Sequence, residues 1–498
     1  MRNQVQLITY VDRLGGGGLA DLGALLAGPL NGVFGGVHLL PFFHPIDGAD
    51  AGFDPIDHTR VDPRLGDWRG VRSLADQVEV MADLIVNHVS ADSPQFQDFS
   101  RRGAESPYAG LFLTLDRVFP GGATEAELLQ IYRPRPGLPF TCVTLQNGER
   151  RILWTTFTSK QVDIDVSHPE GRAYLSGILK SFKASGVSII RLDAAGYAIK
   201  RRGTPSFMIP ETYEFIAGLT REARALGIEV LVEIHSYYRE QIEIARRVDR
   251  VYDFALPPLV LHALHQADGG PLKAWLEIAP RNCITVLDTH DGIGVIDVGA
   301  DAATGRAGLL PPEAIDRLVE TIHAKSGGES RRATGAAASN LDLYQVNCTY
   351  YDALGRDDLA YLTARALQFF APGVPQVYYM GLLAGTNDLE LLARSQVGRD
   401  INRHHYTPSE IATSLDLPVV LDLLDLIRLR NTHPAFAGDF RILPSPANVI
   451  GLEWTHASET ARLVVDLKAG PSVELTFTEN GFTRSFEFAS RSRQTTTA

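Results

Sequence analysis

Long apolar runs are missing from this 498-residue sequence. No stretch approaches the roughly 18 apolar residues of a membrane span, and the N-terminal MRNQVQLITYVDRLGGGG lacks the apolar core of a signal peptide. Cysteine is scarce as well: Cys142, Cys283 and Cys348 are far apart and form no CxxC pair. An odd number of separated cysteines suits a reducing compartment, where we expect them to pack as small hydrophobic side chains. We therefore expect a soluble, cytoplasmic protein with no membrane partner.

Dense runs of lysine and arginine are also absent, and the formal net charge is −12 at pH 7. This balance argues against nucleic acid as a partner. An anionic ligand must then be held by a few local arginines against an unfavourable overall field. The GxGxxG spacing of a dinucleotide-binding sheet is missing too, because GGGG at 15–18 has neither that spacing nor its context.

What the sequence does contain is one repeated pattern, in which short β-rich runs alternate with amphipathic segments of helical length. The segment 209–227 is one such helix, with Pro210 near its start and Gly227 just past its end. Strands alternating with helices predict parallel βα units, and eight of them predict a closed (β/α)₈ TIM barrel of the α/β class. The eight runs are 5–11, 36–43, 80–89, 187–193, 229–235, 250–257, 284–291 and 374–381.

The spacing of the runs is uneven, which predicts insertions in the βα loops. We expect the barrel to comprise 1–86, 167–291 and 356–435, with an inserted subdomain B at 87–166 and a loop-rich subdomain B′ at 292–355. The alternating pattern after residue 436 predicts a small C-terminal β-domain, 436–498, that ends in a disordered tail. At the end of the first insertion, Ser167 and Glu170 have capping-box spacing and predict the start of the next helix.

Polar side chains gather at the carboxyl ends of six of the runs, the face on which barrel enzymes build their active sites. They are His44, Asp50, His88, Asp193, Glu233, His235, His290, Asp291, Tyr378 and Tyr379. Arg191 and Asp193 are two residues apart and project to the same side of a strand. We expect Arg191 to lower the pKa of Asp193 and keep it ionised, as suits a nucleophile.

Two further acids complete a candidate catalytic set. Glu233 lies between Val232 and Ile234, and in apolar surroundings a carboxyl group tends to keep its proton, as a proton donor must. Two carboxyl groups in different environments, about 5 Å apart, are what retaining glycoside chemistry requires, and Asp291 would add a fixed negative charge. Taken alone, Arg191 and Asp193 could equally form a structural ion pair, and a single Glu at a strand end is more often a solvated rim residue. Three acids from three strands at one end of a barrel favour the catalytic interpretation.

Four segments resemble the conserved regions of glycoside hydrolase family 13, the α-amylase family, in order and spacing. They are DLIVNHVS (83–90), IIRLDAAG (189–196), VLVEIHSYY (230–238) and VLDTHDGIG (286–294), and the likeness covers almost the whole chain. Five more segments resemble the members of that family that phosphorolyse sucrose: 48–68, 131–141, 250–258, 335–347 and 398–404.

The resemblance implies a role for each matching residue. It implies Asp193 as nucleophile, Glu233 as general acid/base and Asp291 as transition-state stabiliser. The substrate-binding residues that it implies are Asp50, Phe53, His88, Arg135, Arg191, Tyr197, His235, His290, Asp342, Tyr344, Gln345 and Arg399. Of these, Arg135, Asp342, Tyr344 and Gln345 would line the site that fructose and phosphate occupy in turn. Without the family context, core packing for Phe53 and a solvated charge for Arg135 would be the better interpretations.

The implied reaction converts sucrose and phosphate to α-D-glucose 1-phosphate and fructose with retention of configuration. Phosphate is a co-substrate, no cofactor is expected, and the family suggests a homodimer. Asn87 stands where many α-amylases hold calcium, yet we expect no metal. Alternatives are a phosphorylase of sucrose 6′-phosphate, glucosylglycerol or glucosylglycerate, a family 13 hydrolase or transglucosidase, or a non-catalytic barrel that binds a sugar or a protein. YRPRPG (132–137) and LDLYQ (341–345) favour sucrose.

Overall fold

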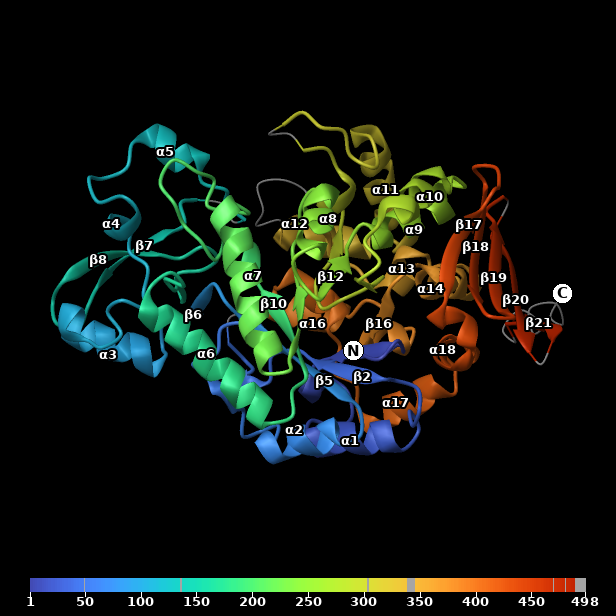
Figure 1. Ribbon diagram of the computed structural model, residues 1–498, viewed down its shortest axis with the longest axis horizontal. Helices are drawn as coiled ribbons and strands as arrows, with labels where there is room; N and C mark the ends of the chain where they lie inside the picture. Colours follow the sequence, from blue (N-terminus) through green and yellow to red (C-terminus); the bar gives the residue numbers. More distant parts are fainter. Residues whose placement is uncertain are drawn as a thin grey trace.

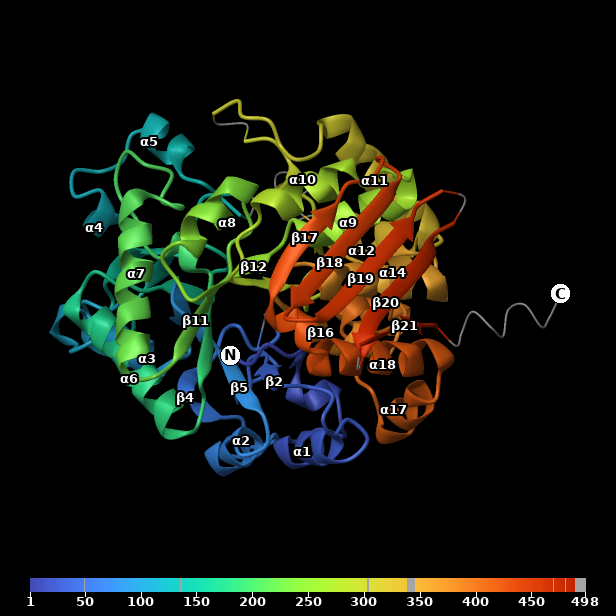
Figure 2. The same ribbon diagram turned by 45° about the vertical axis from the view of Figure 1, so that its right-hand side comes forward.

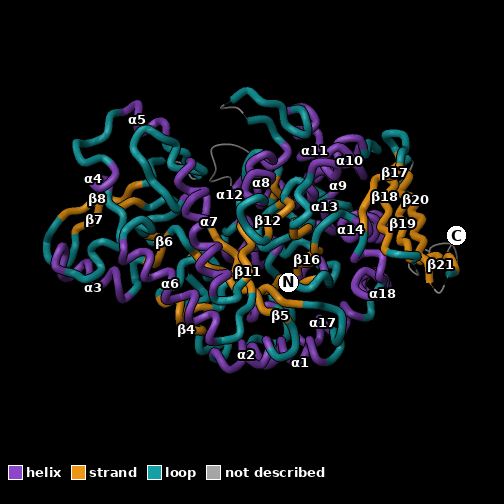
Figure 3. Tube along the Cα trace, in the orientation of Figure 1, coloured by secondary structure: helices purple, strands orange, loops and turns teal. Residues whose placement is uncertain are grey.

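A closed barrel of eight parallel strands forms the centre of the protein (Figures 1 and 3). The computed structural model describes residues 1–48, 50–134, 137–301, 304–337, 345–468, 470–479 and 481–488. Around the barrel the strand order is β1-β16-β13-β12-β11-β10-β5-β2. The strands are β1 (Gln6–Thr9), β2 (Gly36–Leu39), β5 (Glu79–Ile85), β10 (Ile189–Asp193), β11 (Glu229–Val232), β12 (Arg250–Asp253), β13 (Cys283–Thr285) and β16 (Val374–Tyr378). Each lies within or overlaps one of the eight expected runs, so the predicted fold class is confirmed.

Helices surround the barrel and cover its outer face. They include α1 (Leu19–Ala27), α2 (Trp68–Ala75), α6 (Pro169–Ala184), α7 (Pro210–Ala225), α8 (Tyr238–Ala245), α9 (Leu256–Gln266), α10 (Gly270–Ile278), α14 (Asp358–Phe370) and α18 (Pro418–Thr432). The helix α7 begins at Pro210 and Gly227 follows its end at a φ of 70°, as expected. The expected cap of α6 is wrong: His168, not Ser167, is the N-cap and accepts from the backbone N–H of Glu170. Pro169 takes the first helical position, which shifts the cap to the residue just before it.

The two faces of each barrel strand have different neighbours. In β10, Ile190 and Leu192 belong to the main core, whereas Ile189 joins a separate cluster inside the barrel. That cluster consists of Met81, Ile189, Leu231, Tyr252, Phe254, Ile284, Val286 and Val374. Because side chains alternate along a strand, Arg191 and Asp193 share the inward face with Ile189. The apolar cluster thus forms a floor below these charged residues.

The first insertion follows β5 and projects to one side of the barrel, at the left of Figure 1. It contains β6 (His88–Ser90), α3 (Pro94–Arg102), α4 (Leu115–Val118), α5 (Glu125–Gln130), β7 (Phe140–Thr144), β8 (Arg150–Trp154) and β9 (Gln161–Asp163), with a 3-10 turn η2 (Gly103–Glu105). The strands β6 and β9 pair antiparallel, and this pairing places Gln161 and Asp163 near the barrel mouth. A short antiparallel pair, β3 (Phe43–His44) and β4 (Asp57–Val61), follows β2.

A second insertion follows β13. It contains β14 (Ile293–Gly294), η4 (Ile296–Val298), α11 (Pro312–Lys325), α12 (Glu329–Ala337) and β15 (Gln345–Val346), and α13 (Tyr350–Ala353) leads back to the barrel. After β16 the chain forms α15 (Tyr379–Leu382), α16 (Leu389–Ser395), η5 (Gly398–Asn402) and α17 (Pro408–Leu415). The remaining 3-10 turns are η1 (Val11–Arg13), η3 (Ala195–Tyr197) and η6 (Pro434–Ala437). The ranges assigned above to the barrel and its insertions stay predictions.

The C-terminal part is a five-stranded antiparallel sheet, seen on the right in Figure 1 and more nearly face-on in Figure 2. Its strands are β17 (Asp439–Leu443), β18 (Val449–His456), β19 (Glu459–Asp466), β20 (Ser472–Glu479) and β21 (Phe482–Phe486). Trp454 of β18 donates its indole N–H to the carbonyl of Phe370, at the end of α14, over 2.8 Å. The expected disordered tail, 489–498, lies outside the described residues.

The composition predicted that the chain has no membrane span and that its cysteines are buried. Among the described residues, no helix has both the length and the apolar character needed to cross a membrane. Cys283 and Cys348 are buried in the main core as expected. For Cys142 the expectation is wrong, because this cysteine is exposed on the edge of the β7–β8 pair.

Candidate active site

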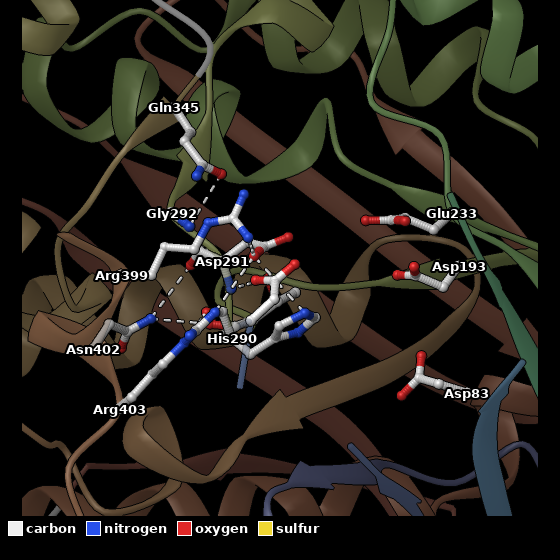
Figure 4. A network of polar contacts seen from close by, with 12 residues as sticks. Asp83, Asp193, Glu233, His290, Asp291, Gly292, Gln345, Arg399, Asn402 and Arg403 are labelled. Atoms are coloured by element: carbon white, nitrogen blue, oxygen red, sulfur yellow. Dashed lines mark hydrogen bonds and ion pairs between the residues drawn. The ribbon is translucent and has the colours of Figure 1, made fainter. Parts of the chain in front are cut away.

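The three candidate acids lie at the carboxyl ends of barrel strands. Asp193 is the last residue of β10, Glu233 directly follows β11, and Asp291 lies in the segment after β13. All three line one pocket of about 490 Å³. In Figure 4, Asp193 and Glu233 lie one above the other and face the group around Asp291. One nitrogen of His235 and one oxygen each of Glu233 and Asp291 lie within 4.8 Å of one another. The acids therefore converge on a single cavity.

The same pocket brings together most of the other residues expected from the sequence. Besides the three acids, it is lined by Asp50, Phe53, His88, Tyr197, His235, His290 and Arg399. Gln345 lies beside it in β15, where its side-chain oxygen accepts from the backbone N–H of Gly292 over 3.2 Å. Arg135, Asp342 and Tyr344 lie outside the described residues. The individual roles of all these residues stay predictions.

Arg191 lies beneath the pocket and contacts three carboxylates at once. Its Nη1 is 2.5 Å from Asp83 Oδ1 and 2.9 Å from Asp193 Oδ1. Its Nη2 is 2.9 Å from Glu233 Oε1. Asp83 is the Cα partner of Arg191 in the β5–β10 pairing, so the register of the barrel sets this contact. Its side chain is only 2% exposed and is the shared counter-ion of the acids, and the expected contact with the sugar stays a prediction.

Arg191 lowers the pKa of Asp193 as expected, but the expected net result, a pKa below the ordinary value, is wrong. Burial raises the pKa of Asp193 well above its ordinary value, and the charges of Glu233 and Asp83 raise it further, while Arg191 opposes them. One guanidinium divided among three carboxylates cannot offset their desolvation and mutual repulsion. Glu233 does not lie in purely apolar surroundings either, because Arg191 and His235 both face it. Asp193 is therefore harder to ionise than a free carboxyl group, although Arg191 lies beside it.

Asp291 has a different environment, in which two arginines and a histidine face it. Arg399 Nη1 lies 2.9 Å from its Oδ1, with His290 Nε2 at 3.8 Å and Arg403 Nη2 at 3.9 Å. Burial alone would raise the pKa of Asp291, but Arg399, His290 and Arg403 lower it far below its ordinary value. Asp291 is therefore a permanent negative charge, as the sequence led us to expect.

Arg399 is carried by η5, which is bound firmly to the segment that holds Asp291. Asn402 donates to the carbonyl oxygens of Thr289 (2.9 Å) and Asp291 (3.4 Å), and Arg403 Nε donates to that of His290 over 2.9 Å (Figure 4). The buried Tyr378 hydroxyl donates to the carbonyl of Asn402 from behind. Tyr378 thus supports the segment that carries Arg399. It is not among the described residues that line the pocket.

Another part of the pocket wall holds polar groups suited to sugar hydroxyls. Gln161 donates its amide to Asp50 Oδ2 over 3.2 Å and lies 3.1 Å from His88 Nε2, which donates to the carbonyl of Phe53. The Phe53 ring stacks on His290 with centroids 4.9 Å apart. Gln161 was missed in the sequence because it lies in the inserted subdomain, more than seventy positions from His88, and no local pattern marks it.

Aromatic side chains continue this wall toward the mouth of the pocket. Tyr197 contacts the rings of Phe157 and Phe207 at centroid distances of 5.2 Å and 4.8 Å. Tyr132 stacks on Phe207 at 4.5 Å. Of these aromatic residues, only Tyr197 was predicted from the sequence to line the site. Flat apolar faces of this kind suit the C–H faces of a sugar ring.

Asn87, at which the family resemblance pointed to a calcium position, contacts a lysine side chain. Lys200 Nζ lies 2.5 Å from Asn87 Oδ1 and 2.6 Å from Asp163 Oδ2. Thr156 also donates to Asp163, through its backbone N–H and its hydroxyl. The ammonium group thereby joins the segment after β10, which carries Lys200, to the first insertion, which carries Asn87, Thr156 and Asp163.

Lys200→Met is expected to lower the free energy of unfolding by about 3 kcal/mol, because it leaves the buried carboxylate of Asp163 without a cation. Thermal and denaturant unfolding of the full chain measure this loss. The matched control is Lys160→Met, which removes an exposed lysine of the same subdomain. Equal stability of the two variants would show that the ammonium group does not hold the subdomain.

Comparison with known proteins agrees with this geometry. Residues 32–247 match the family model described as "Alpha amylase, catalytic domain". A sucrose phosphorylase of Agrobacterium vitis is 64% identical over 94% of this chain and 96% of that protein. A sucrose phosphorylase of Bifidobacterium adolescentis is 54% identical over 96% of this chain and 94% of that protein.

The chain belongs to the α-amylase family, glycoside hydrolase family 13. A solved structure of this family, the sucrose 6F-phosphate phosphorylase from Thermoanaerobacter thermosaccharolyticum, has a TM-score of 0.90 at 39% identity and covers 98% of both chains. The two structures thus share the barrel, its insertions and the C-terminal sheet.

Proposed function

We propose that this chain catalyses the reversible phosphorolysis of sucrose to α-D-glucose 1-phosphate and D-fructose. The observation that carries the proposal is the 64% and 54% identity, over nearly the whole chain, to two proteins named sucrose phosphorylase. The pocket supports it chemically, because it offers two neighbouring carboxyl groups for a double displacement and a third, permanent charge.

The first half of the reaction breaks the glycosidic bond of sucrose. The ionised carboxylate of Asp193 attacks the anomeric carbon of the glucosyl unit, and the bond to the fructosyl oxygen breaks as Glu233 protonates that oxygen. Asp291 lies across the same pocket as a fixed anion and stabilises the positive charge that develops on the sugar ring. Fructose leaves, and the glucosyl unit stays bound to Asp193 as an ester.

The second half returns the glucosyl unit to phosphate. A hydroxyl oxygen of phosphate forms a bond to the anomeric carbon, and Glu233, now a carboxylate, takes the proton of that hydroxyl. The ester bond to Asp193 breaks, and its electron pair returns to the carboxylate. Two inversions give net retention, so the product is the α-anomer. We assign to Arg135 the donor fork that receives the phosphate.

The alternative to sucrose is another glucoside, in which a different group takes the place of fructose. A glucosylglycerol phosphorylase of Marinobacter adhaerens is 40% identical over 98% of this chain. A hydrolase or transglucosidase of the same family is a further alternative. These enzymes would share Asp193, Glu233 and Asp291, so the acceptor side decides among them. The higher identity to the two sucrose phosphorylases favours sucrose.

Incubation of the purified chain with sucrose, with and without phosphate, tests the proposal. We expect glucose 1-phosphate to be the main product when phosphate is present and only slow release of free glucose when it is absent. The reverse reaction, from glucose 1-phosphate with fructose, fructose 6-phosphate, glycerol or glycerate, should be fastest with fructose. Free glucose as the main product in both conditions would assign a hydrolase instead.

We propose that the reaction uses no metal or other cofactor. Within the described part of the chain, one group of residues has the spacing for an ion, namely Glu233, His235 and Asp291. Arg191 and Arg399 already supply a cation within 2.9 Å of each of the two carboxylates. The same assay with a chelator present should give an unchanged rate. We also propose a cytoplasmic homodimer that serves sucrose catabolism, for which the separated cysteines and the family resemblance are the support.

A further inference from the structure

Asp297 is a buried carboxylate beside the pocket and is not one of the three catalytic acids. It lies in η4, in the second insertion, and is fully buried. Its Oδ1 accepts from the backbone N–H of Ser236 over 3.2 Å and from Gln241 Nε2 over 3.1 Å. Its Oδ2 lies 3.1 Å from His235 Nδ1. All of these contacts are to donors, and the contact with Oδ2 places a proton of His235 on Nδ1.

The close packing at Gly294 keeps this contact direct. A Cβ at Gly294 would lie 2.7 Å from Asp297 Oδ2 and 3.4 Å from His235 Nδ1. No larger residue fits there without displacing the pair. On its other side the His235 ring stacks on Phe254, with centroids 3.7 Å apart and planes 18° apart. The imidazole is therefore fixed in orientation by two separate segments of the chain, 294–297 on one side and Phe254 on the other.

The second ring nitrogen of His235 faces the pocket. His235 Nε2 lies 3.9 Å from Glu233 Oε1, and His235 itself lines the cavity. The titratable groups that act on the imidazole are Asp297 from η4, Glu233 from the end of β11 and Asp291 from the segment after β13. The last two already have arginine partners, Arg191 and Arg399. Within the described part of the chain, the ion pair of Asp297 is with His235, which is therefore its counter-ion.

We propose that Asp297 is a positioning residue that keeps His235 protonated, so that its Nε2–H presents a positive charge to the phosphate that attacks the glucosyl ester. The inference rests on the proposed function, because it concerns the acceptor in the second half of that reaction. Glu233 handles the proton of the leaving or entering oxygen, so a cation beside Glu233 lies where the acceptor binds. A positive charge assists an anionic acceptor much more than it assists water.

The electrostatic balance of His235 agrees with this arrangement. Burial lowers the pKa of the imidazole, but Asp297, Glu233 and Asp291 together raise it above its ordinary value. A raised pKa extends the charged form of the imidazole toward the neutral pH at which phosphate is an anion. The chain needs such local cations because its overall charge of −12 repels phosphate.

Asp297→Asn tests the inference, because it keeps the shape and the contacts to Ser236 and Gln241 but removes the charge. At about pH 7.5 we expect phosphorolysis to fall by about 10-fold or more, while hydrolysis of sucrose without phosphate changes far less. Toward about pH 5.5 the imidazole regains its proton and the deficit in phosphorolysis should shrink. The matched control is Asp253→Asn, another fully buried carboxylate, which accepts from Trp275 and Leu256.

A spectroscopic measurement decides the matter even if the variant folds poorly. The ¹⁵N resonances of the His235 ring, assigned by their loss in His235→Gln, should show an imidazolium in the wild-type chain at about pH 7.5. A neutral His235 there, or an equal loss of phosphorolysis and hydrolysis at every pH in Asp297→Asn, would overturn the inference. Failure of the wild-type chain to make glucose 1-phosphate would instead contradict the proposed function, and the ¹⁵N result would still report the charge of His235.

Discussion

Asp193→Asn lowers kcat/KM for sucrose by about 10⁴-fold or more, because it removes the atom that forms the glucosyl ester. Phosphorolysis and hydrolysis fall together, since both pass through that ester. Initial rates of glucose 1-phosphate and glucose release measure the two reactions separately. Loss of only one of them would show that Asp193 is not the shared nucleophile.

The same substitution should leave the fold intact and raise its stability. Burial and the nearby carboxylates of Glu233 and Asp83 raise the pKa of Asp193, so its charge is destabilising at neutral pH. A neutral amide of the same shape removes that repulsion and leaves Arg191 to the two remaining acids. We expect a higher melting temperature for Asp193→Asn than for the wild-type chain. A lower melting temperature would show that the contact with Arg191 outweighs the repulsion.

Arg191→Met is expected to lower the free energy of unfolding by about 3–5 kcal/mol, because it leaves three carboxylates without their common cation. Activity should be lost as well, since Asp193 then keeps its proton. Without a cation the three acids have raised pKa values in the folded state, so the stability that they contribute is present at acidic pH and is lost as the pH rises. The defect should therefore be smaller near pH 5 than near pH 8, as measured by denaturant unfolding at both.

Arg430→Met is the matched control for this prediction. Arg430 is also a buried arginine, but among the described residues it donates to the side chain of Asn3 and to the carbonyls of Asn3, Phe369 and Gly373, none of them a carboxylate. Its loss should destabilise the chain without the rise of the defect between about pH 5 and pH 8. The same pH dependence in both variants would contradict the shared counter-ion.

The fold could be predicted from the sequence because a barrel strand buried on both faces is a nearly continuous apolar run. The run ending in Arg191 and Asp193 is one example, and its polar end marks the mouth of the barrel. The cap of α6 was misplaced because Ser167 and His168 are both plausible caps before Pro169. Boundaries of this kind depend on one backbone angle, which local sequence does not fix.

The site was predictable in its acids and less so in what surrounds them. The catalytic acids could be predicted because each lies at or beyond the carboxyl end of its own barrel strand. They are Asp193, Glu233 and Asp291. The shared role of Arg191 could not, because Asp83 is 108 residues away and meets it only through the β5–β10 register. The pKa of Asp193 was misjudged for the same reason, since it is the balance of burial and three neighbouring charges. Gln161 and Asp297 come from the insertions, whose placement follows from tertiary packing.

The most direct test of the account is to trap the glucosyl ester. In Glu233→Gln, α-D-glucosyl fluoride needs no acid to release fluoride, whereas the second step lacks its base, so the ester should accumulate. Mass spectrometry of the quenched and digested chain should then find one glucosyl unit on Asp193. A glucosyl unit on another residue, or turnover of the fluoride with no ester on any residue, would contradict the account.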